Sequence, residues 1–145
     1  MKKILASLLC AACLAFAGSA SAAVQEFGPD FAKFTIDVKD GWTATAIDSG
    51  VQVIKADKSC ALTIVAIKTE GNNAETIGKA VAEQAGMKDA KVVTNEPGNY
   101  VCAGTISGAN TVIVTLVDGD KGVVSSVSGS NLDASSEILD TLKDK

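Results

Sequence analysis

The cysteines are the residues of this chain whose possible chemistry is easiest to specify. Cys10 and Cys13 fall in an apolar N-terminal segment, whereas Cys60 and Cys102 lie in the body of the chain, each in phase with the apolar positions of a predicted strand. In an exported protein an even pair favours a disulfide, which would close a loop of about 42 residues and stabilise the fold by roughly 4 kcal/mol. Two buried free thiols that pack as small hydrophobes are the alternative. A redox site is the third interpretation, but the chain has no C-x-x-C motif and no His or Arg that would lower a thiol pKa.

The residue types that are missing exclude most catalytic chemistry. The chain has no His, and its 13 basic residues are all Lys. It therefore offers no imidazole for acid-base catalysis, nucleophile activation or metal binding, and no guanidinium to hold a phosphate through two hydrogen bonds. The 17 acidic residues fall mostly at predicted turns and on polar helix faces, which is typical of a solvated surface. We expect no catalytic residue, no metal site and no cofactor.

Two further patterns point to possible binding sites. Asp118-Gly119-Asp120 resembles the start of a calcium loop, but Gly122 and Asn131 stand where further ligands are needed, and a hairpin turn explains the same residues. Trp42 and Tyr100 combine a large apolar ring with a polar group and are the candidates to line a ligand pocket. Because Trp42 opens a predicted strand, packing at a sheet edge is the competing interpretation for it.

The first 22 residues have the layout of a secretory signal peptide. Lys2 and Lys3 precede an apolar run over residues 4–16, and Ala20-Ser21-Ala22 forms a cleavage site that predicts a mature N-terminus at Ala23. A transmembrane anchor is the first alternative, although the run is shorter than the roughly 20 residues that a span needs. Lipidation of Cys13 is the second. We expect localisation to the periplasm or secretion, with no membrane span in the mature protein.

The charge of the mature chain is acidic. Cleavage removes Lys2 and Lys3, which leaves 11 Lys against 17 acidic residues and a formal charge of about −6. Such a chain is repelled by nucleic acid and by anionic membrane surfaces. We therefore expect no nucleic-acid partner; the charge favours solubility, and the sequence leaves the oligomeric state open.

Turn residues divide the mature chain into short segments that predict an α+β domain. Alternating or apolar runs predict strands over 31–38, 42–47, 51–56, 60–68, 91–94, 100–106, 111–117 and 122–127. The almost wholly apolar run 60–68 is typical of a central strand covered on both faces. Helical periodicity predicts a helix over 74–85, capped by Asn73 and ended by Gly86, and another over 134–143, capped by Asp133, that packs inward through Ile138, Leu139 and Leu142.

The short connections predict antiparallel neighbours, so the fold class is a largely antiparallel β-sheet with helices packed on it. Residues 31–145 form one domain in this interpretation. Residues 23–30 have no clear period and end in Gly28-Pro29, so we expect a flexible N-terminal arm there.

The order of these parts resembles the PsbP/Mog1-like fold family, including its bacterial envelope members of unknown function. The resemblance rests on Phe34-Thr-Ile36 followed by Gly41-Trp42, on Val51-Gln-Val53-Ile54, on Leu62-Thr-Ile64, and on the closing segment 137–143. It spans about residues 31–143. The family often has Pro just before the Gly, where this chain has Lys39-Asp40. The resemblance implies an α/β/α sandwich with a non-enzymatic accessory or binding role, and it supplies no ligand.

Three functions remain in competition. The first is an exported, non-catalytic accessory or binding domain of the bacterial cell envelope, which we favour, with a protein as its partner. The second is a hydrolase that uses two carboxylates, for which a pocket holding two acids within about 10 Å would count. The third is a structural protein-interaction module, for which an exposed apolar patch would count.

Overall fold

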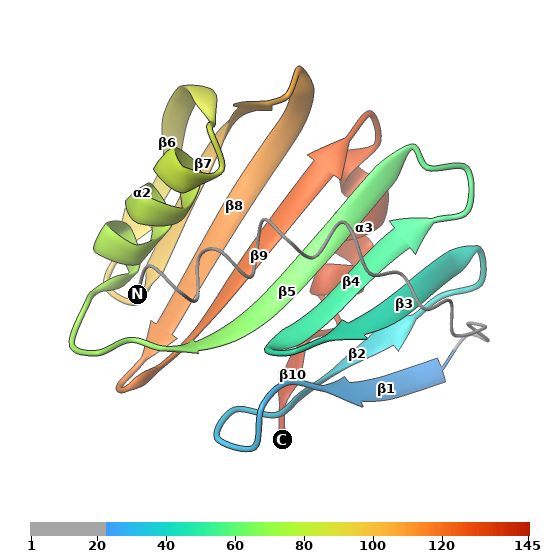
Figure 1. Cartoon of the computed structure of the whole chain (residues 1–145), viewed down its shortest axis with the longest axis horizontal. Coiled ribbons are helices and arrows are strands. Elements are labelled where there is room, and N and C mark those ends of the chain that lie inside the picture. Colours follow the sequence, from blue (N-terminus) through green and yellow to red (C-terminus); the bar gives the residue numbers. More distant parts are fainter. Residues whose placement is uncertain (1–22) are drawn as a thin grey trace.

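The computed structural model describes residues 23–145, which form two antiparallel sheets and two helices (Figure 1). The large sheet has seven strands in the order β3-β4-β5-β9-β8-β7-β6, and the small sheet has three in the order β1-β2-β10. All pairings are antiparallel, which confirms the predicted fold class. The strands are β1 (Ala23–Phe27), β2 (Phe34–Val38), β3 (Trp42–Ile47), β4 (Gly50–Lys55), β5 (Cys60–Lys68), β6 (Lys88–Glu96), β7 (Asn99–Ile106), β8 (Ala109–Asp118), β9 (Lys121–Gly129) and β10 (Lys143–Asp144); the helices are α2 (Ala74–Gln84) and α3 (Leu132–Leu139).

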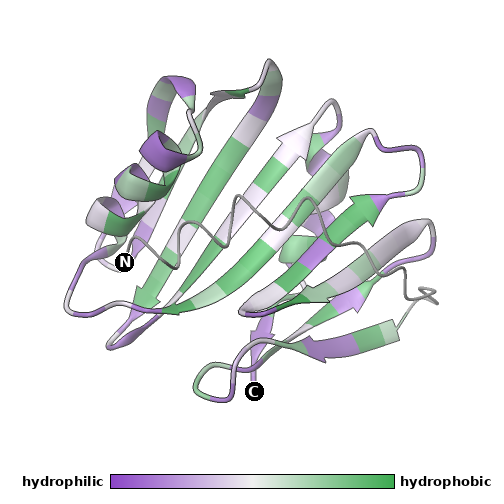
Figure 2. Cartoon of the chain, viewed as in Figure 1, coloured by the Kyte–Doolittle hydropathy of each residue, from purple (hydrophilic) through white to green (hydrophobic). Residues whose placement is uncertain are grey.

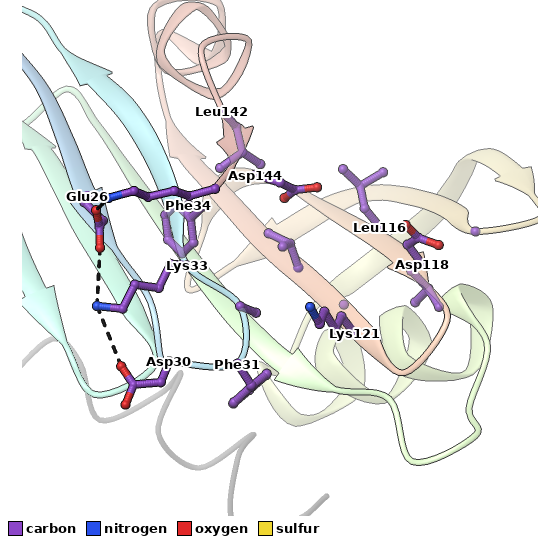
Figure 3. A pocket seen from close by; sticks show the side chains of 16 residues that line it. Glu26, Asp30, Phe31, Lys33, Phe34, Leu116, Asp118, Lys121, Leu142 and Asp144 are labelled. Carbon is purple, nitrogen blue, oxygen red and sulfur yellow. Dashed lines mark hydrogen bonds and ion pairs between the residues drawn. The ribbon is translucent and has the colours of Figure 1, made fainter.

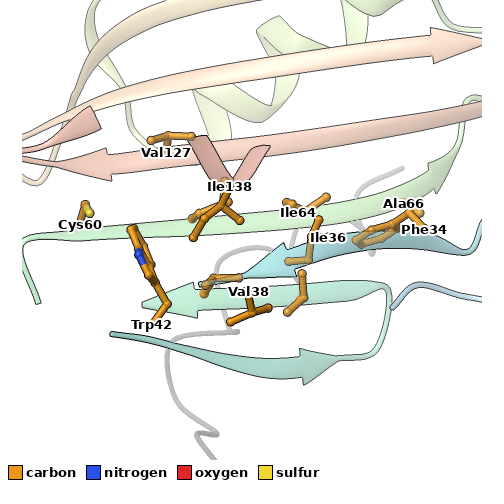
Figure 4. Close-up of a cluster of buried hydrophobic side chains, with 12 residues drawn as sticks. Phe34, Ile36, Val38, Trp42, Cys60, Ile64, Ala66, Val127 and Ile138 are labelled. Atoms are coloured by element: carbon orange, nitrogen blue, oxygen red, sulfur yellow. The ribbon is translucent and has the colours of Figure 1, made fainter. Parts of the chain in front are cut away.

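The two faces of the large sheet carry separate hydrophobic cores. On one face α2 packs on β7 and β8; on the other, α3 packs on β5, β9 and β2. Figure 1 shows α2 in front of the large sheet and α3 behind it. The α3-side core consists of Phe34, Ile36, Val38, Trp42, Val51, Val53, Cys60, Leu62, Ile64, Ala66, Val127 and Ile138 (Figure 4). The α2-side core consists of Val65, Ile67, Ala74, Ile77, Val81, Ala82, Tyr100, Cys102, Ile113 and Val124.

Strand β5 is central and contributes to both cores, as its apolar run predicts. Leu62 and Ile64 face the α3 side, whereas Val65 and Ile67 belong to the α2-side core. The pairing with β4 on one flank and β9 on the other leaves no edge of β5 exposed. Figure 2 shows hydrophobic colouring along most of β5, the strand that contributes four residues to the α3-side core and two to the α2-side core.

The segment predicted as a flexible arm is a strand in the structure. All five residues of β1 pair with β2, from Ala23 opposite Val38 to Phe27 opposite Phe34. The connection needs Gly28, whose φ is +97° and whose position would bring a Cβ within 2.6 Å of the Ala32 carbonyl oxygen. In this short strand the apolar Val24 is exposed while the polar Gln25 is half-buried, so the polarity of the residues does not follow their burial. The sequence interpretation was therefore wrong for residues 23–27.

The ends of the helices agree with the sequence prediction for α2 and differ for α3. Asn73 caps α2 by accepting a hydrogen bond from the Thr76 amide, and Gly86 follows the helix at φ +72°. The cap of α3 is Asn131 rather than Asp133, and the helix ends at Leu139 rather than at residue 143. The following turn directs the chain back to β2, where Lys143 and Asp144 form β10.

Cys60 and Cys102 are buried free thiols, so the disulfide prediction was wrong. They lie on β5 and β7, which are separated by β9 and β8. Three strand spacings of about 4.8 Å place the strands roughly 14 Å apart, whereas a disulfide needs Cα atoms within about 7 Å. The two side chains also belong to cores on opposite faces of the sheet. Each cysteine alternates in step with the apolar residues of its strand, which correctly predicted that it is buried. This alternation does not show in which of the two cores the side chain lies.

Candidate functional site

Trp42 and Tyr100, the predicted pocket residues, are not brought together. Trp42 is 6% exposed in the α3-side core, and Tyr100 is 3% exposed in the α2-side core. Burial raises the pKa of the Tyr100 phenol, with a further contribution from the nearby Cys102. Burial also raises the pKa of the Cys102 thiol, which stays protonated and is not poised for thiolate chemistry. These residues serve packing in this structure, and neither lines the groove that the fold creates elsewhere.

A groove of about 700 Å³ lies between the small sheet and the β8–β9 end of the large sheet (Figure 3). Three segments far apart in the sequence form most of it: the β1–β2 turn with its flanks, the β8–β9 hairpin, and the chain after α3; Gly98 of the β6–β7 turn completes the lining. The lining residues are Glu26, Asp30, Phe31, Ala32, Lys33, Phe34, Gly98, Leu116, Val117, Asp118, Lys121, Gly122, Val123, Leu142, Asp144 and Lys145. Its volume falls within the range of ordinary ligand sites, about 300–1,000 Å³.

One end of the groove carries a group of mutually neutralised charges. The Glu26 carboxylate accepts hydrogen bonds from Lys145 and lies 3.3 Å from the Lys33 ammonium. Lys33 is also 3.7 Å from Asp30. The hydrogen bonds from Lys145 and then Lys33 hold the pKa of Glu26 below its ordinary value of 4.5. Glu26 is therefore ionised at neutral pH and ties the chain end to β1.

The β8–β9 wall and Asp144 of β10 present charges of both signs that form no ion pair among the described residues. Within residues 23–145, no ion pair closer than 4.0 Å involves Lys121, Asp118 or Asp144. Asp118 and Lys121 stand opposite each other at the hairpin end, two positions from the Leu116–Val123 pair. Residues two apart in a strand point to the same face, so these charges border the apolar Leu116 and Val123. The groove thus joins an apolar floor to available charges of both signs.

The apolar floor continues beyond the groove along β8 and β7. Leu116 is 40% exposed, and Val114 and Val112 follow it on the same face. Val101 and Ala103 of β7 stand opposite Val114 and Val112 and are likewise only half-buried. Helix α3 packs on β5 and β9, so β7 and β8 lie beyond the edge of the helix. We call the five residues Val101, Ala103, Val112, Val114 and Leu116 the apolar strip.

The Asp118-Gly119-Asp120 sequence is a hairpin turn, in agreement with the simpler interpretation of these residues. The Gly119 carbonyl accepts a hydrogen bond from the Thr69 hydroxyl at 3.1 Å, and the Asp120 carbonyl accepts one from the Thr69 amide at 3.0 Å. Across the part of the chain that the structure describes, no three His, Cys, Asp or Glu side chains are grouped so that they could hold a metal ion. No helix in this part is long and apolar enough to cross a membrane.

Sequence reasoning missed the groove. Phe31 was assigned to a strand, yet it lies in the β1–β2 connection, where the Lys68 ammonium stands 5.2 Å from the centre of its ring. A local signal existed in Leu116, an apolar residue two positions before an exposed Asp at a hairpin end. That signal did not show which other segments would lie opposite it.

Acid should loosen the chain end at the groove. Because the folded pKa of Glu26 is lowered, its ion pairs support β10 above pH about 4.5 and are lost as the pH falls through the lowered folded value. We expect the Lys145 amide resonance, whose N–H donates to the Lys33 carbonyl, to move toward its unstructured position as the pH falls below about 4.5. The effect on overall stability is small because the carboxylate is at the surface.

The matched comparison uses Glu26→Gln and Asp57→Asn. Glu26→Gln should shift the Lys145 resonance already at pH 6 and make its acid titration smaller. The pKa of Asp57 is also lowered, by hydrogen bonds from Ser59, but its turn is remote from β10, so Asp57→Asn should leave the Lys145 titration unchanged. A Lys145 titration of unchanged size in Glu26→Gln would contradict the assignment.

Comparison with solved structures finds a PsbP-family counterpart. The chain is similar to cyanobacterial PsbP (CyanoP) from Synechocystis sp. PCC 6803, with a TM-score of 0.49, 12% identity, and coverage of 91% of this chain and 98% of that chain. The counterpart agrees with the PsbP part of the sequence resemblance, whereas the Mog1-like part stays a prediction. No protein-family model matches the sequence, and no curated protein matches it. At a TM-score of 0.49 and 12% identity, this similarity carries no argument about function.

Proposed function

We propose that the chain is an exported, non-catalytic accessory domain of the bacterial cell envelope that binds a protein partner through the groove and the apolar strip. The observation that carries this proposal is the juxtaposition of an open apolar floor with unpaired charges of both signs. A small ligand would need only the groove to bind. The floor extends beyond it, and exposed apolar surface bordered by polar groups is the usual mark of a protein-binding site.

The charges support a polypeptide rather than a simple anion or cation. Lys121 and Asp118, at the end of the β8–β9 hairpin, would satisfy groups of either sign, as the side chains of a peptide segment supply. The leader predicted over residues 1–22 supports export, although it lies outside the described residues. Its cleavage before Ala23 remains part of the proposal.

The competing function is a carboxylate hydrolase, since Glu26, Asp30, Asp118 and Asp144 all line the groove. A general acid that works at neutral pH needs a raised pKa, usually from an apolar setting. The pKa of Glu26 is instead lowered by two lysines, so this carboxyl is already ionised and paired. This favours binding over catalysis.

Capture of the partner should depend on Leu116. The mature chain, tagged at its N-terminus, is incubated with the envelope fraction of the native host in three forms: unchanged, Leu116→Asp and Val92→Asp. Val92 is 55% exposed on the edge strand β6 and serves as the matched control. We expect capture of the same protein to fall at least about tenfold with Leu116→Asp, since a charge in a buried contact costs more than 1.4 kcal/mol, and to persist with Val92→Asp.

Equal capture by both variants would refute the groove as the binding site. Turnover in hydrolase screens that Asp118→Asn abolishes would favour the competing function. Mass spectrometry of protein from its native host should find Ala23 at the N-terminus, and a retained leader or a lipid on Cys13 would refute the export assignment.

A further inference from the structure

Residues 143–145 close one side of the groove and are weakly anchored. Strand β10 pairs with β2 at two positions only, Lys143 opposite Thr35 and Asp144 opposite Phe34. All three residues from Lys143 to Lys145 are exposed. A short exposed strand with two pairings opens at little cost in free energy, because few contacts must be broken.

The firm anchor of the C-terminal segment lies before these residues. The Thr141 hydroxyl donates to the Ile138 carbonyl at 2.6 Å and accepts from the Asp37 amide at 2.8 Å. Beyond Thr141, the Lys145 amide donates to the Lys33 carbonyl at 3.1 Å, and the Lys145 ammonium pairs with Glu26 at the surface. Residues 143–145 can therefore leave β2 while α3 and Thr141 stay in place.

Release of this end would uncover a strand edge beside the groove. Strand β2 pairs with β1 along its other edge. A new strand would therefore pair with the backbone of Phe34 and Thr35, which Lys143 and Asp144 now occupy. An uncovered edge is a ready template for an extended peptide, whose backbone supplies affinity and whose side chains fill the neighbouring pockets. The pockets here are the groove and its charges.

We propose that residues 143–145 hold the place of an extended, basic segment of the partner, which displaces them and adds as a strand to β2. This inference rests on the proposed function and names the partner's chemistry. We infer a basic segment from the charges around Glu26. Once Lys145 leaves, Lys33 alone faces the two carboxylates of Glu26 and Asp30, and a second cation is needed to neutralise them. The acidic charge of the mature chain, about −6, attracts such a segment from a distance.

The test uses a peptide that the chain itself specifies. Labelled Thr-Leu-Lys-Asp-Lys, the sequence of residues 141–145, is titrated into the mature chain and into a form that ends at Leu142, with binding followed by NMR shifts of β2 amides. The tethered end competes at high effective concentration, so we expect the shortened chain to bind the peptide at least about tenfold more tightly. The same peptide with Glu in place of its last Lys should bind the shortened chain several-fold more weakly.

A second variant covers the case in which shortening disturbs the fold. Lys145→Ala keeps every backbone pairing of β10 but removes the ion pair with Glu26, so peptide binding should rise several-fold above that of the unchanged chain. Equal binding by all forms, or shifts confined to residues outside β2, would overturn the proposal. Dimers of the full chain that form by exchange of residues 143–145 would also overturn it, because the edge would then serve a second copy.

Failure of this inference can be told from failure of the proposed function. If Leu116→Asp abolishes capture of the partner while removal of residues 143–145 leaves it unchanged, the groove binds the partner without strand addition. If Leu116→Asp leaves capture intact, the proposed function itself is refuted.

Discussion

Gly50→Ala should destabilise the fold by at least about 3 kcal/mol, because the position has no room for a side-chain carbon. Gly50 begins β4 and stands opposite Val65 of the central strand β5. A Cβ there would lie 1.8 Å from the Ile64 carbonyl oxygen and 2.8 Å from its carbon. Both atoms are backbone, so no rotamer change relieves the overlap, and β4 must shift away from β5. We expect the midpoint of thermal unfolding to fall by more than roughly 10 °C.

Gly122→Ala is the control for this substitution. Gly122 is also buried in a strand of the large sheet, but a Cβ there would approach its nearest neighbours, a side-chain carbon of Ile67 and the Leu116 carbonyl oxygen, to only 3.2 Å. Adjustments of a few tenths of an ångström accommodate that contact, so the loss should be about 1 kcal/mol or less. Equal losses for the two variants would show that the close approach of Gly50 to β5 is not what makes glycine necessary.

The fold was predictable from the sequence because its signals are local. The apolar run of β5 predicted a strand buried on both faces, and its bounds, 60–68, agree with the structure. Asn73 and Gly86 predicted the ends of α2 because capping depends on residues within one turn of the helix. Predictions failed where the secondary structure of a segment depends on a contact distant in the sequence. Segment 23–27 is a strand because β2 pairs with it, and the chain leaves the helix after Leu139 and then pairs with β2.

The candidate site was not predictable for the same reason. The groove is formed by residues around 26–34, 116–123 and 142–145, and no local pattern states that these segments meet. The disulfide prediction failed similarly, since strand order puts β9 and β8 between the two cysteines. Residue type limits the charged groups of the groove to Lys, Asp and Glu, since the chain has no His and no Arg.

Ile138→Ala should cost about 3–4 kcal/mol, the typical loss for an isoleucine removed from a closed core. Ile138 is fully buried and is the residue through which α3 enters the α3-side core, between both sheets (Figure 4). Ile138→Val should cost only about 1 kcal/mol. Leu139 was predicted to be equally inward, but it is half-buried at the edge of this core, so Leu139→Ala should cost less, about 1–2 kcal/mol.

Denaturant unfolding of these three variants distinguishes a docked helix from a loosely attached one. If α3 is docked as the structure shows, the losses follow the order Ile138→Ala, Leu139→Ala, Ile138→Val. A loss near zero for Ile138→Ala would mean that α3 does not close the core. The Thr141 anchor would then lose its support, because its hydroxyl donates to the Ile138 carbonyl. Ile138 therefore connects two parts of the structure: its side chain packs in the α3-side core, and its carbonyl holds Thr141, which precedes the segment that borders the groove.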